Sequence, residues 1–349
     1  MIARYAVSRD DGWYEAWPDV ALTLSGKLVC VFAQCTHHGD RSATRLMMIE
    51  STDRGRTWGN KRPFTERTNG YPYWNCPRIS RLRDGRLVIV ADRVSQPKEG
   101  GGRNFLWIGD AEGLRWEGPI ETPLEGIVPD KLCELPSGRW LLSAHARSGQ
   151  WLRYSDDRGA NWSDPVLVAA DPELKLCEVS LLPLEDGTLV AFLRENSGLG
   201  RDCYKTISYD QGASWSKLYR MPLPGCHRPV AGLLRSGHVL LTYRFMQGGK
   251  GWLGKWTQNF FAALTDQASA KAQERREQWT RIMPVDYDRS PVADLGYSGW
   301  VQFDDGEIYI VQYIVDDAPK GQIRGYSLRE EDFMITEETE QPRHECTTE

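Results

Sequence analysis

An eight-residue motif that occurs three times constrains the fold of this chain more than any other feature. The motif reads S-x-D-x-G-x-[TSN]-W, and its copies begin at Ser51, Ser155 and Ser208. The pattern suits a hairpin turn in which the Asp accepts backbone N–H groups, the Gly is left-handed and the Trp packs between neighbouring sheets. The starts differ by 104 and 53 residues, which is two periods and one period of about 52 residues. The motif therefore predicts a structural clasp in a repeated β unit.

A second repeat sets the number of units. A turn that ends in Gly recurs between runs of alternating apolar residues, which is the pattern of a β-hairpin. The six turns end at Gly26, Gly85, Gly138, Gly187, Gly237 and Gly306. We therefore predict an all-β protein, a six-bladed β-propeller, formed by residues 1–349 as a single domain. Residues 2–7 are expected to add a strand to the last blade and close the ring, which removes an exposed sheet edge.

Two blades depart from the regular pattern. The interval between the fifth and sixth turns is long and contains a polar stretch of helix-forming composition at about 265–280. We predict that this stretch is an insertion that replaces the fifth blade's motif. In the second blade the motif is degenerate, and the segment from Gly113 to Trp116 is its expected remnant.

Composition argues against several classes of function. The net charge is −5, with 43 basic and 48 acidic residues well mixed, so no basic stripe favours nucleic acid or an anionic membrane. Eight cysteines without C-x-x-C pairs and histidines without metal-ligand spacing predict reduced thiols, no catalytic metal and no cofactor. The first residues lack an apolar signal core, which predicts a cytoplasmic protein, or a secreted or periplasmic one if a signal was removed. The sequence makes no prediction of oligomeric state.

The propeller geometry identifies candidate site residues. The innermost strand of each blade begins at the mouth of a central funnel, and its partner strand returns there, so residues nine before and seven after each turn Gly should meet. Ala33, Cys76 and Pro129 are expected to serve packing. The other nine positions hold Trp17, Asp92, His145, Glu178, Arg194, Arg228, Arg244, Tyr297 and Tyr313. Ionisable and aromatic residues at equivalent positions predict a ligand-binding funnel, although salt bridges that close the channel remain an equal alternative for Asp92 and His145.

Two of these segments and the repeated motif resemble sequence segments of the sialidase superfamily. The repeated motif is similar to the Asp-box of sialidases, and residues 177–194 resemble the segment that carries their catalytic glutamate and one arginine. Residues 296–306 resemble the segment that carries their tyrosine nucleophile. The resemblance spans nearly the whole chain. It implies an exo-glycoside hydrolase that retains anomeric configuration, with Tyr297 as nucleophile and Glu178 as its base.

The resemblance also implies a general acid/base in the loop after the first blade's second strand. In the family this residue is an aspartate. The loop here spans residues 34–41, and Asp40 is the best candidate, with His38 as its substitute.

The chain departs from sialidases where they bind the substrate carboxylate with three arginines. Trp17 lies in the segment of the first arginine, and Tyr313 replaces the glutamate that steadies it. Arg194 remains, and Arg228 and Arg244 lie on the blade that should carry the third. The joint loss of a charge pair predicts a changed ligand site. We expect an acidic oligosaccharide or glycoconjugate, ending in sialic acid or another carboxylated sugar, with Trp17 and Tyr313 as stacking faces.

Two other functions remain open. One is a propeller lyase or atypical hydrolase of uronate-containing polysaccharide, in which His145, His37 or His38 would act with Tyr297 and Arg244. The other is a sugar-binding propeller without chemistry, because a fold alone does not establish activity.

Overall fold

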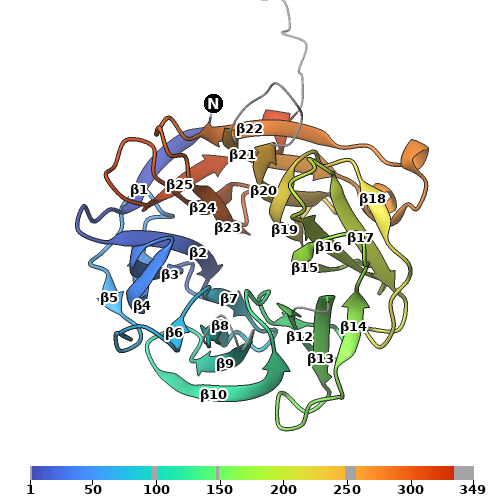
Figure 1. Ribbon diagram of the computed structural model, residues 1–349, viewed down its shortest axis with the longest axis horizontal. Coiled ribbons are helices and arrows are strands. Elements are labelled where there is room, and N and C mark those ends of the chain that lie inside the picture. The colour runs from blue at the N-terminus through green and yellow to red at the C-terminus, as the bar shows by residue number, and fades with distance from the viewer. Residues whose placement is uncertain (1, 96–100, 147–148, 248–256, 334–349) are drawn as a thin grey trace, which may run out of the picture.

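The computed structural model describes residues 2–95, 101–146, 149–247 and 257–333. Six antiparallel sheets surround a central axis like the blades of a propeller (Figure 1). This arrangement confirms the predicted all-β, six-bladed fold. No described helix is both long and apolar enough to cross a membrane.

Each blade contains four strand positions, numbered from the axis outward. The first blade holds β2 (Tyr14–Leu22), β3 (Leu28–His37), β4 (Asp40–Ser51) and β5 (Arg62–Pro63). The second holds a divided inner strand, β6 (Tyr73–Trp74) and β7 (Arg78–Arg81), then β8 (Leu87–Val94), β9 (Gly102–Gly109) and β10 (Trp116–Glu125). The third holds β11 (Cys133–Glu134), β12 (Trp140–Ala146), β13 (Gly149–Ser155) and β14 (Val166–Ala169).

The remaining blades follow the same order. The fourth holds β15 (Leu176–Pro183), β16 (Leu189–Glu195), β17 (Cys203–Ser208) and β18 (Tyr219–Met221). The fifth holds β19 (Cys226–Leu233), β20 (Val239–Gln247), β21 (Thr257–Thr265) and β22 (Arg281–Tyr287). The sixth holds β23 (Leu295–Gln302), β24 (Ile308–Ile314), β25 (Gln322–Leu328) and, from the other end of the chain, β1 (Ala3–Ser8). Because β1 pairs antiparallel with β25, the predicted closure of the ring is confirmed.

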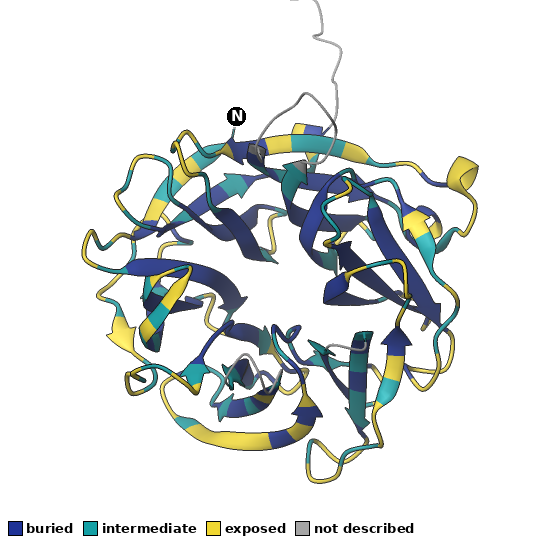
Figure 2. Ribbon diagram, in the orientation of Figure 1, coloured by how far each residue is buried: buried dark blue, intermediate teal, exposed yellow. Residues whose placement is uncertain are grey.

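Most residues of the inner strands are buried (Figure 2), and polar residues inside the ring join one blade to the next. Asp19 Oδ2 accepts a hydrogen bond from the Ile79 backbone at 3.0 Å, and Asp130 Oδ2 accepts one from Leu181 at 2.8 Å. Two arginines balance these carboxylates. Arg78 Nε lies 3.2 Å from Asp19, and Arg228 Nη2 lies 4.0 Å from Asp130. Buried charges need such partners, so these four side chains form a structural floor below the funnel.

The repeated motif forms the predicted clasp between the third and fourth strands of a blade. In its first copy, Asp53 accepts bonds from the Thr57 backbone at 2.9 Å and from the Thr57 hydroxyl at 2.6 Å. Trp58 donates its indole N–H to Gly55 O. In the second blade the remnant keeps this geometry, because Asp110 accepts from the backbone of Leu114 and Trp116 donates to Gly113 O.

The insertion replaces the fifth blade's clasp, as the sequence predicts. It contains a short helix, α1 (Gln267–Lys271), and a 3-10 turn, η2 (Arg275–Glu277). Lys205 Nζ donates to the carbonyls of Ser269 at 3.1 Å and Ala270 at 2.7 Å, which ties α1 to the fourth blade. Burial lowers the pKa of this lysine to about 7. A second 3-10 turn, η3 (Glu330–Phe333), ends the described chain.

Candidate active site

The inner strands bulge where they reach the mouth of the funnel. Pairing with the second strand shifts register between Ala16 and Asp19, between Cys177 and Val179, between His227 and Val230, and between Gly296 and Gly299. The residues inside these bulges have left-handed backbones, with φ of 56° at Trp17, 38° at Glu178, 51° at Arg228 and 51° at Tyr297. A bulge re-aims a side chain out of the regular alternation of a strand. This is why four of the positions nine residues before the turn Gly converge near the axis.

Tyr297 and Glu178 are in direct contact, as predicted. The Tyr297 hydroxyl donates a hydrogen bond to Glu178 Oε1. Arg194 Nη1 donates to both oxygens of the same carboxylate at 2.7 Å, and its Nη2 donates to Asn196 Oδ1 at 2.7 Å. All three side chains are buried. The fourth and sixth blades thus meet in a phenol, a carboxylate and a guanidinium linked in series.

The charges of this group are fixed by its neighbours. Burial alone would raise the pKa of Glu178, but the charge of Arg194 and the bond from Tyr297 outweigh it and hold the pKa well below its usual range. Burial and the Glu178 charge raise the pKa of Tyr297 well above that of a free phenol. The resting site therefore holds an anionic Glu178 and a neutral Tyr297.

Two histidines beside this group remain neutral. Burial lowers the pKa of His145, with Arg194 and Arg228 adding to the effect and Glu178 opposing it. Burial, with Arg194 and Arg244 nearby, lowers the pKa of His227 to about 2. Neither imidazole can add positive charge to the site near neutral pH. No group of three or more possible metal ligands occurs in the ranges of the chain that the structure describes.

A cavity of about 320 Å³ opens on Tyr297 from the side of the first two blades. It is lined by Trp17, His38, Gly39, Arg41, Tyr71, Tyr73, Asn75, Cys76, Val128 and Tyr297. The Arg41 guanidinium lies 3.9 Å from the centre of the Trp17 ring and 5.5 Å from that of Tyr73. These two aromatic rings stabilise the positive charge of the Arg41 guanidinium at this position. Trp17 is itself buried beneath Arg41, so it supports the guanidinium and does not offer the free stacking face that the sequence predicts.

Asp294 connects this cavity to the sixth blade. Its carboxylate is hydrogen-bonded to His38 Nδ1 and accepts bonds from the hydroxyls of Tyr14 at 2.5 Å and Tyr313 at 2.8 Å. Arg244 Nη1 lies 3.8 Å away. Burial would raise the pKa of Asp294, but the bond and charge of His38, followed by Arg244, lower it. An anionic Asp294 fixes the orientation of the His38 ring.

Comparison with known proteins identifies the family. A family model described as a BNR repeat-like domain matches residues 65–310, which is more than half of the chain. The chain belongs to this family. A search of curated proteins finds no match to the sequence.

Solved structures with the same fold include sialidases. A protein of unknown function from Dyadobacter fermentans has a TM-score of 0.76 at 21% identity, over 94% of this chain and 99% of that one. The intramolecular trans-sialidase from Ruminococcus gnavus, solved with oseltamivir carboxylate, has a TM-score of 0.70 at 13% identity, over 93% and 96% of the two chains. A Hadza microbial sialidase has a TM-score of 0.68 at 17% identity, over 95% and 69%. These likenesses show the fold of this BNR repeat-like protein.

Of the predicted site residues, Trp17, His38 and Tyr297 line the cavity, and four of the others are engaged with protein groups. Arg228 is fully buried, and it donates to the carbonyls of Val179 at 3.2 Å and Pro129 at 3.0 Å. Asp92 is also fully buried, and it accepts hydrogen bonds from Asn75 and from the backbones of Cys76 and Val128. These described partners carry no charge, so Asp92 does not form the salt bridge that was its alternative role. Tyr313 is buried and offers no stacking face, because it supports Asp294. Asp40 lies exposed in the hairpin turn and accepts from the Ser42 backbone.

The structure also adds residues that the sequence did not identify. Arg41 is next to Asp40 in the sequence, but its contact with Trp17 joins β4 to β2, and the sequence does not predict that contact. Asp294 lies three residues before Tyr297, just outside the repeat positions. Asn196 lies two residues after Arg194. Polar residues that flank the repeat positions would include Asp294 and Asn196 but not Arg41, which lies eight residues after Ala33.

Proposed function

We propose that this protein is a retaining exo-glycoside hydrolase, related in mechanism to sialidases, that releases a terminal acidic sugar. One observation carries the proposal: a neutral Tyr297 donates its proton toward an anionic Glu178 that Arg194 holds in place, at the edge of a cavity. A buried carboxylate beside a phenol provides a base for a nucleophile and has no evident use in a protein that only binds.

The chemistry would follow two steps. Tyr297 Oη attacks the anomeric carbon and transfers its proton to Glu178 while the glycosidic C–O bond breaks. The departing oxygen takes a proton from a general acid, which leaves a glycosyl-tyrosine intermediate. Water then attacks the anomeric carbon and gives a proton to the residue that acted as the general acid. The bond to Tyr297 breaks, and Tyr297 recovers its proton from Glu178. A neutral phenol approaches an anionic sugar more easily than a carboxylate would, because like charges repel.

We assign the general acid/base to His38. His38 lines the cavity with Tyr297, and its Nδ1 is bonded to Asp294, which leaves Nε2 for the substrate. A carboxylate that orients a histidine in this way is a recurring arrangement in proton transfer. Asp40, the first choice from the sequence, lies in the exposed turn two residues away.

Arg41 and Arg244 would bind the acidic group of the sugar. Arg41 lines the cavity, and among the described residues its side chain donates one hydrogen bond, to Cys35 Sγ at 3.5 Å, so most of its donors remain for a ligand. Arg244 uses Nη1 on Leu295 O and Asp294. Guanidinium groups bind carboxylates through paired N–H donors. In this proposal Arg41, stacked on Trp17, compensates for the missing first arginine.

Product analysis tests the proposal. The purified protein and its Tyr297→Phe variant would be incubated with sialylated and uronate-bearing oligosaccharides, and the products identified by mass spectrometry. We expect a saturated acidic monosaccharide from the unmodified protein alone. An unsaturated product would favour the lyase, and equal release by the Tyr297→Phe variant would overturn the role of Tyr297. Binding without any product would favour the sugar-binding propeller.

A further inference from the structure

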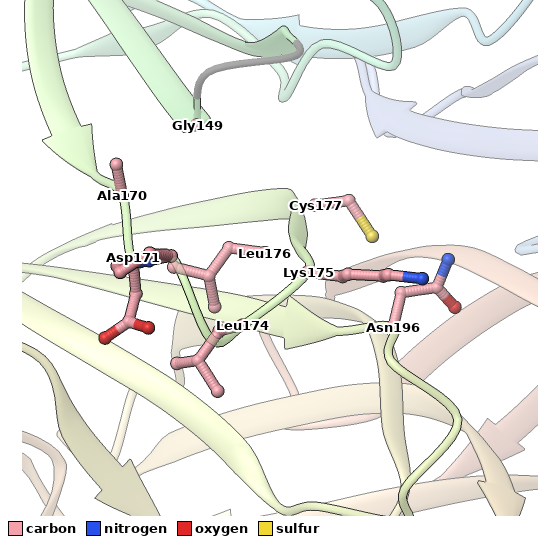
Figure 3. A pocket seen from close by; sticks show the side chains of 9 residues that line it. Gly149, Ala170, Asp171, Leu174, Lys175, Leu176, Cys177 and Asn196 are labelled. Atoms are coloured by element: carbon pink, nitrogen blue, oxygen red, sulfur yellow. The ribbon is translucent and has the colours of Figure 1, made fainter.

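A second and larger pocket lies at the mouth between the third and fourth blades (Figure 3). Its volume is about 540 Å³, within the range of roughly 300–1,000 Å³ that is usual for small-molecule sites. Its walls come from the first residue of β13, the connection between β14 and β15, the first two residues of β15, and the residue that follows β16. The cavity with Arg41 is a separate one, lined mainly by residues of the first two blades together with Val128 and Tyr297.

This pocket adjoins the catalytic group. Asn196 lines it and accepts a hydrogen bond from Arg194 Nη2 at 2.7 Å. Cys177 also lines it, and its Sγ lies 3.8 Å from Glu178 Oε2. The pocket is therefore a neighbouring site for another part of a glycan whose terminal sugar contacts Tyr297.

The polar groups of the pocket suit an anion. Lys175 is exposed there (Figure 3), and no hydrogen bond or ion pair with another described residue engages its ammonium group. The carboxylate next to it in the sheet, Glu195, is already used, because it accepts from the backbones of Lys175 and Ser197 and from the Ser197 hydroxyl. Asp171 accepts from the Glu173 backbone, and Figure 3 shows its carboxylate directed away from Lys175. Asn196 offers its amide N–H groups.

We propose that this pocket is a subsite that binds a second carboxylate or sulfate of the bound glycan, in addition to the acidic group of the terminal sugar. Lys175 supplies the charge and Asn196 a neutral donor, while Leu174 and Leu176 provide apolar surface. The inference rests on the proposed function, because it places the terminal sugar beside Tyr297. It extends that function by making the protein selective for glycans with two acidic groups.

Binding measurements with matched glycans test the subsite. The protein with Tyr297→Phe, which prevents turnover, would be titrated calorimetrically with three probe pairs. The first pair is 3′-sialyllactose and its α2,8-disialyl analogue, which adds a carboxylate. The second is 3′-sialyllactose and its galactose-6-sulfate, which adds a sulfate. The third is a glucuronate-terminated chondroitin trisaccharide with and without 4-sulfate.

We expect the added acidic group to tighten binding about tenfold in at least one pair, which is the size of one charge-assisted hydrogen bond. Lys175→Met in the same background should abolish that gain and leave the binding of the less acidic partner unchanged. Lys217→Met, at an exposed lysine of the same blade, should keep the gain. The proposal is overturned if no pair shows a gain or if the gain survives Lys175→Met. Failure of Tyr297 as a nucleophile would appear instead as turnover by the Tyr297→Phe variant.

Discussion

The clasp turns and the funnel mouth lie at opposite ends of the same blades and share an unusual backbone. Arg54, Arg158 and Gln211 in the clasps have φ of 63°, 60° and 58°, close to the values of 38° to 56° at the mouth bulges. For residues other than Gly this left-handed conformation costs about 1–2 kcal/mol. The two regions therefore carry a similar local strain and must compensate for it.

They compensate in different ways. Each clasp closes on bonds inside its own eight residues, such as those from Ser155 and Asn161 to Asp157. The first clasp adds bonds from Arg54 and Trp58 to Asp305 and Tyr309 of the sixth blade. At the mouth the partners come from other blades: Tyr297 contacts Glu178 across 119 residues, and Arg228 reaches Pro129 O across 99. The internal bonds of a clasp can form within one blade, whereas the site at the mouth exists only in the closed ring.

The largest expected effect concerns the mouth. Tyr297→Phe should reduce turnover by about 10³-fold or more, because the nucleophile is lost, while the melting temperature changes little. Glu178→Gln should reduce turnover as far by removing the base, and it should also lower stability, because Arg194 is then left buried without its charge partner. Steady-state kinetics and thermal melts measure the two effects. Full activity of either variant would contradict the assignment.

A second prediction separates the two acid/base candidates. His38→Ala should slow hydrolysis of a natural glycan by about 100-fold, which is typical for the loss of a general acid. It should slow an aryl glycoside of the same sugar far less, because a phenol leaves without being protonated. Asp40→Ala is the matched variant and should change neither rate. If Asp40→Ala shows the selective loss and His38→Ala does not, the acid/base role belongs to Asp40.

A third prediction concerns a clasp. Asp210 accepts bonds from the Ser214 backbone, the Ser214 hydroxyl and the Ser208 hydroxyl, so Asp210→Ala should cost about 1 kcal/mol, as the loss of a helix cap does. Turnover should be unchanged. Urea denaturation of both proteins measures the difference, and a fall in kcat at unchanged substrate affinity would break the proposed division between the two ends.

The stability difference between the unmodified protein and the Asp210→Ala variant should depend on pH. Burial pushes the pKa of Asp210 upward, but the bonds from Ser214 and Ser208 outweigh it and hold the pKa below the usual value of an aspartate. A group with a lowered native pKa binds fewer protons when folded, so its contribution is present above the unfolded pKa and declines as the pH falls. The gap between the unmodified protein and the Asp210→Ala variant should therefore shrink below about pH 4.

The smallest expected effect tests the backbone strain itself. Arg158 has a left-handed backbone at an exposed position, and Gly adopts this conformation freely. Arg158→Gly should raise the free energy of unfolding by about 0.5 kcal/mol, because relief of strain slightly exceeds the added entropy of the unfolded chain. Arg158→Ala retains the strain and serves as the control. Equal stability of the two variants would show that this clasp bears no such cost.

Several features of the protein follow from its sequence alone. The repeated clasp and the six turn glycines determine the blades, because hairpin turns and the alternation of strands depend on neighbouring residues. The same spacing correctly brings Tyr297 and Glu178 together, since equivalent positions of a repeat lie at the same height around the axis. The insertion and the closing strand follow as well, from an interrupted period and an unpaired strand.

Only the tertiary structure decides what each charged residue does. Arg228 and Arg41 are both arginines, but the ring buries Arg228 against the carbonyls of Val179 and Pro129 and leaves Arg41 at the cavity, stacked on Trp17. Asp294 gains its role from His38, 256 residues away in the chain. The sequence sets which residues reach the mouth; the packing of blades against one another sets which donors are consumed by buried carbonyls and which stay free, because a buried polar group must find a partner before it can serve a ligand.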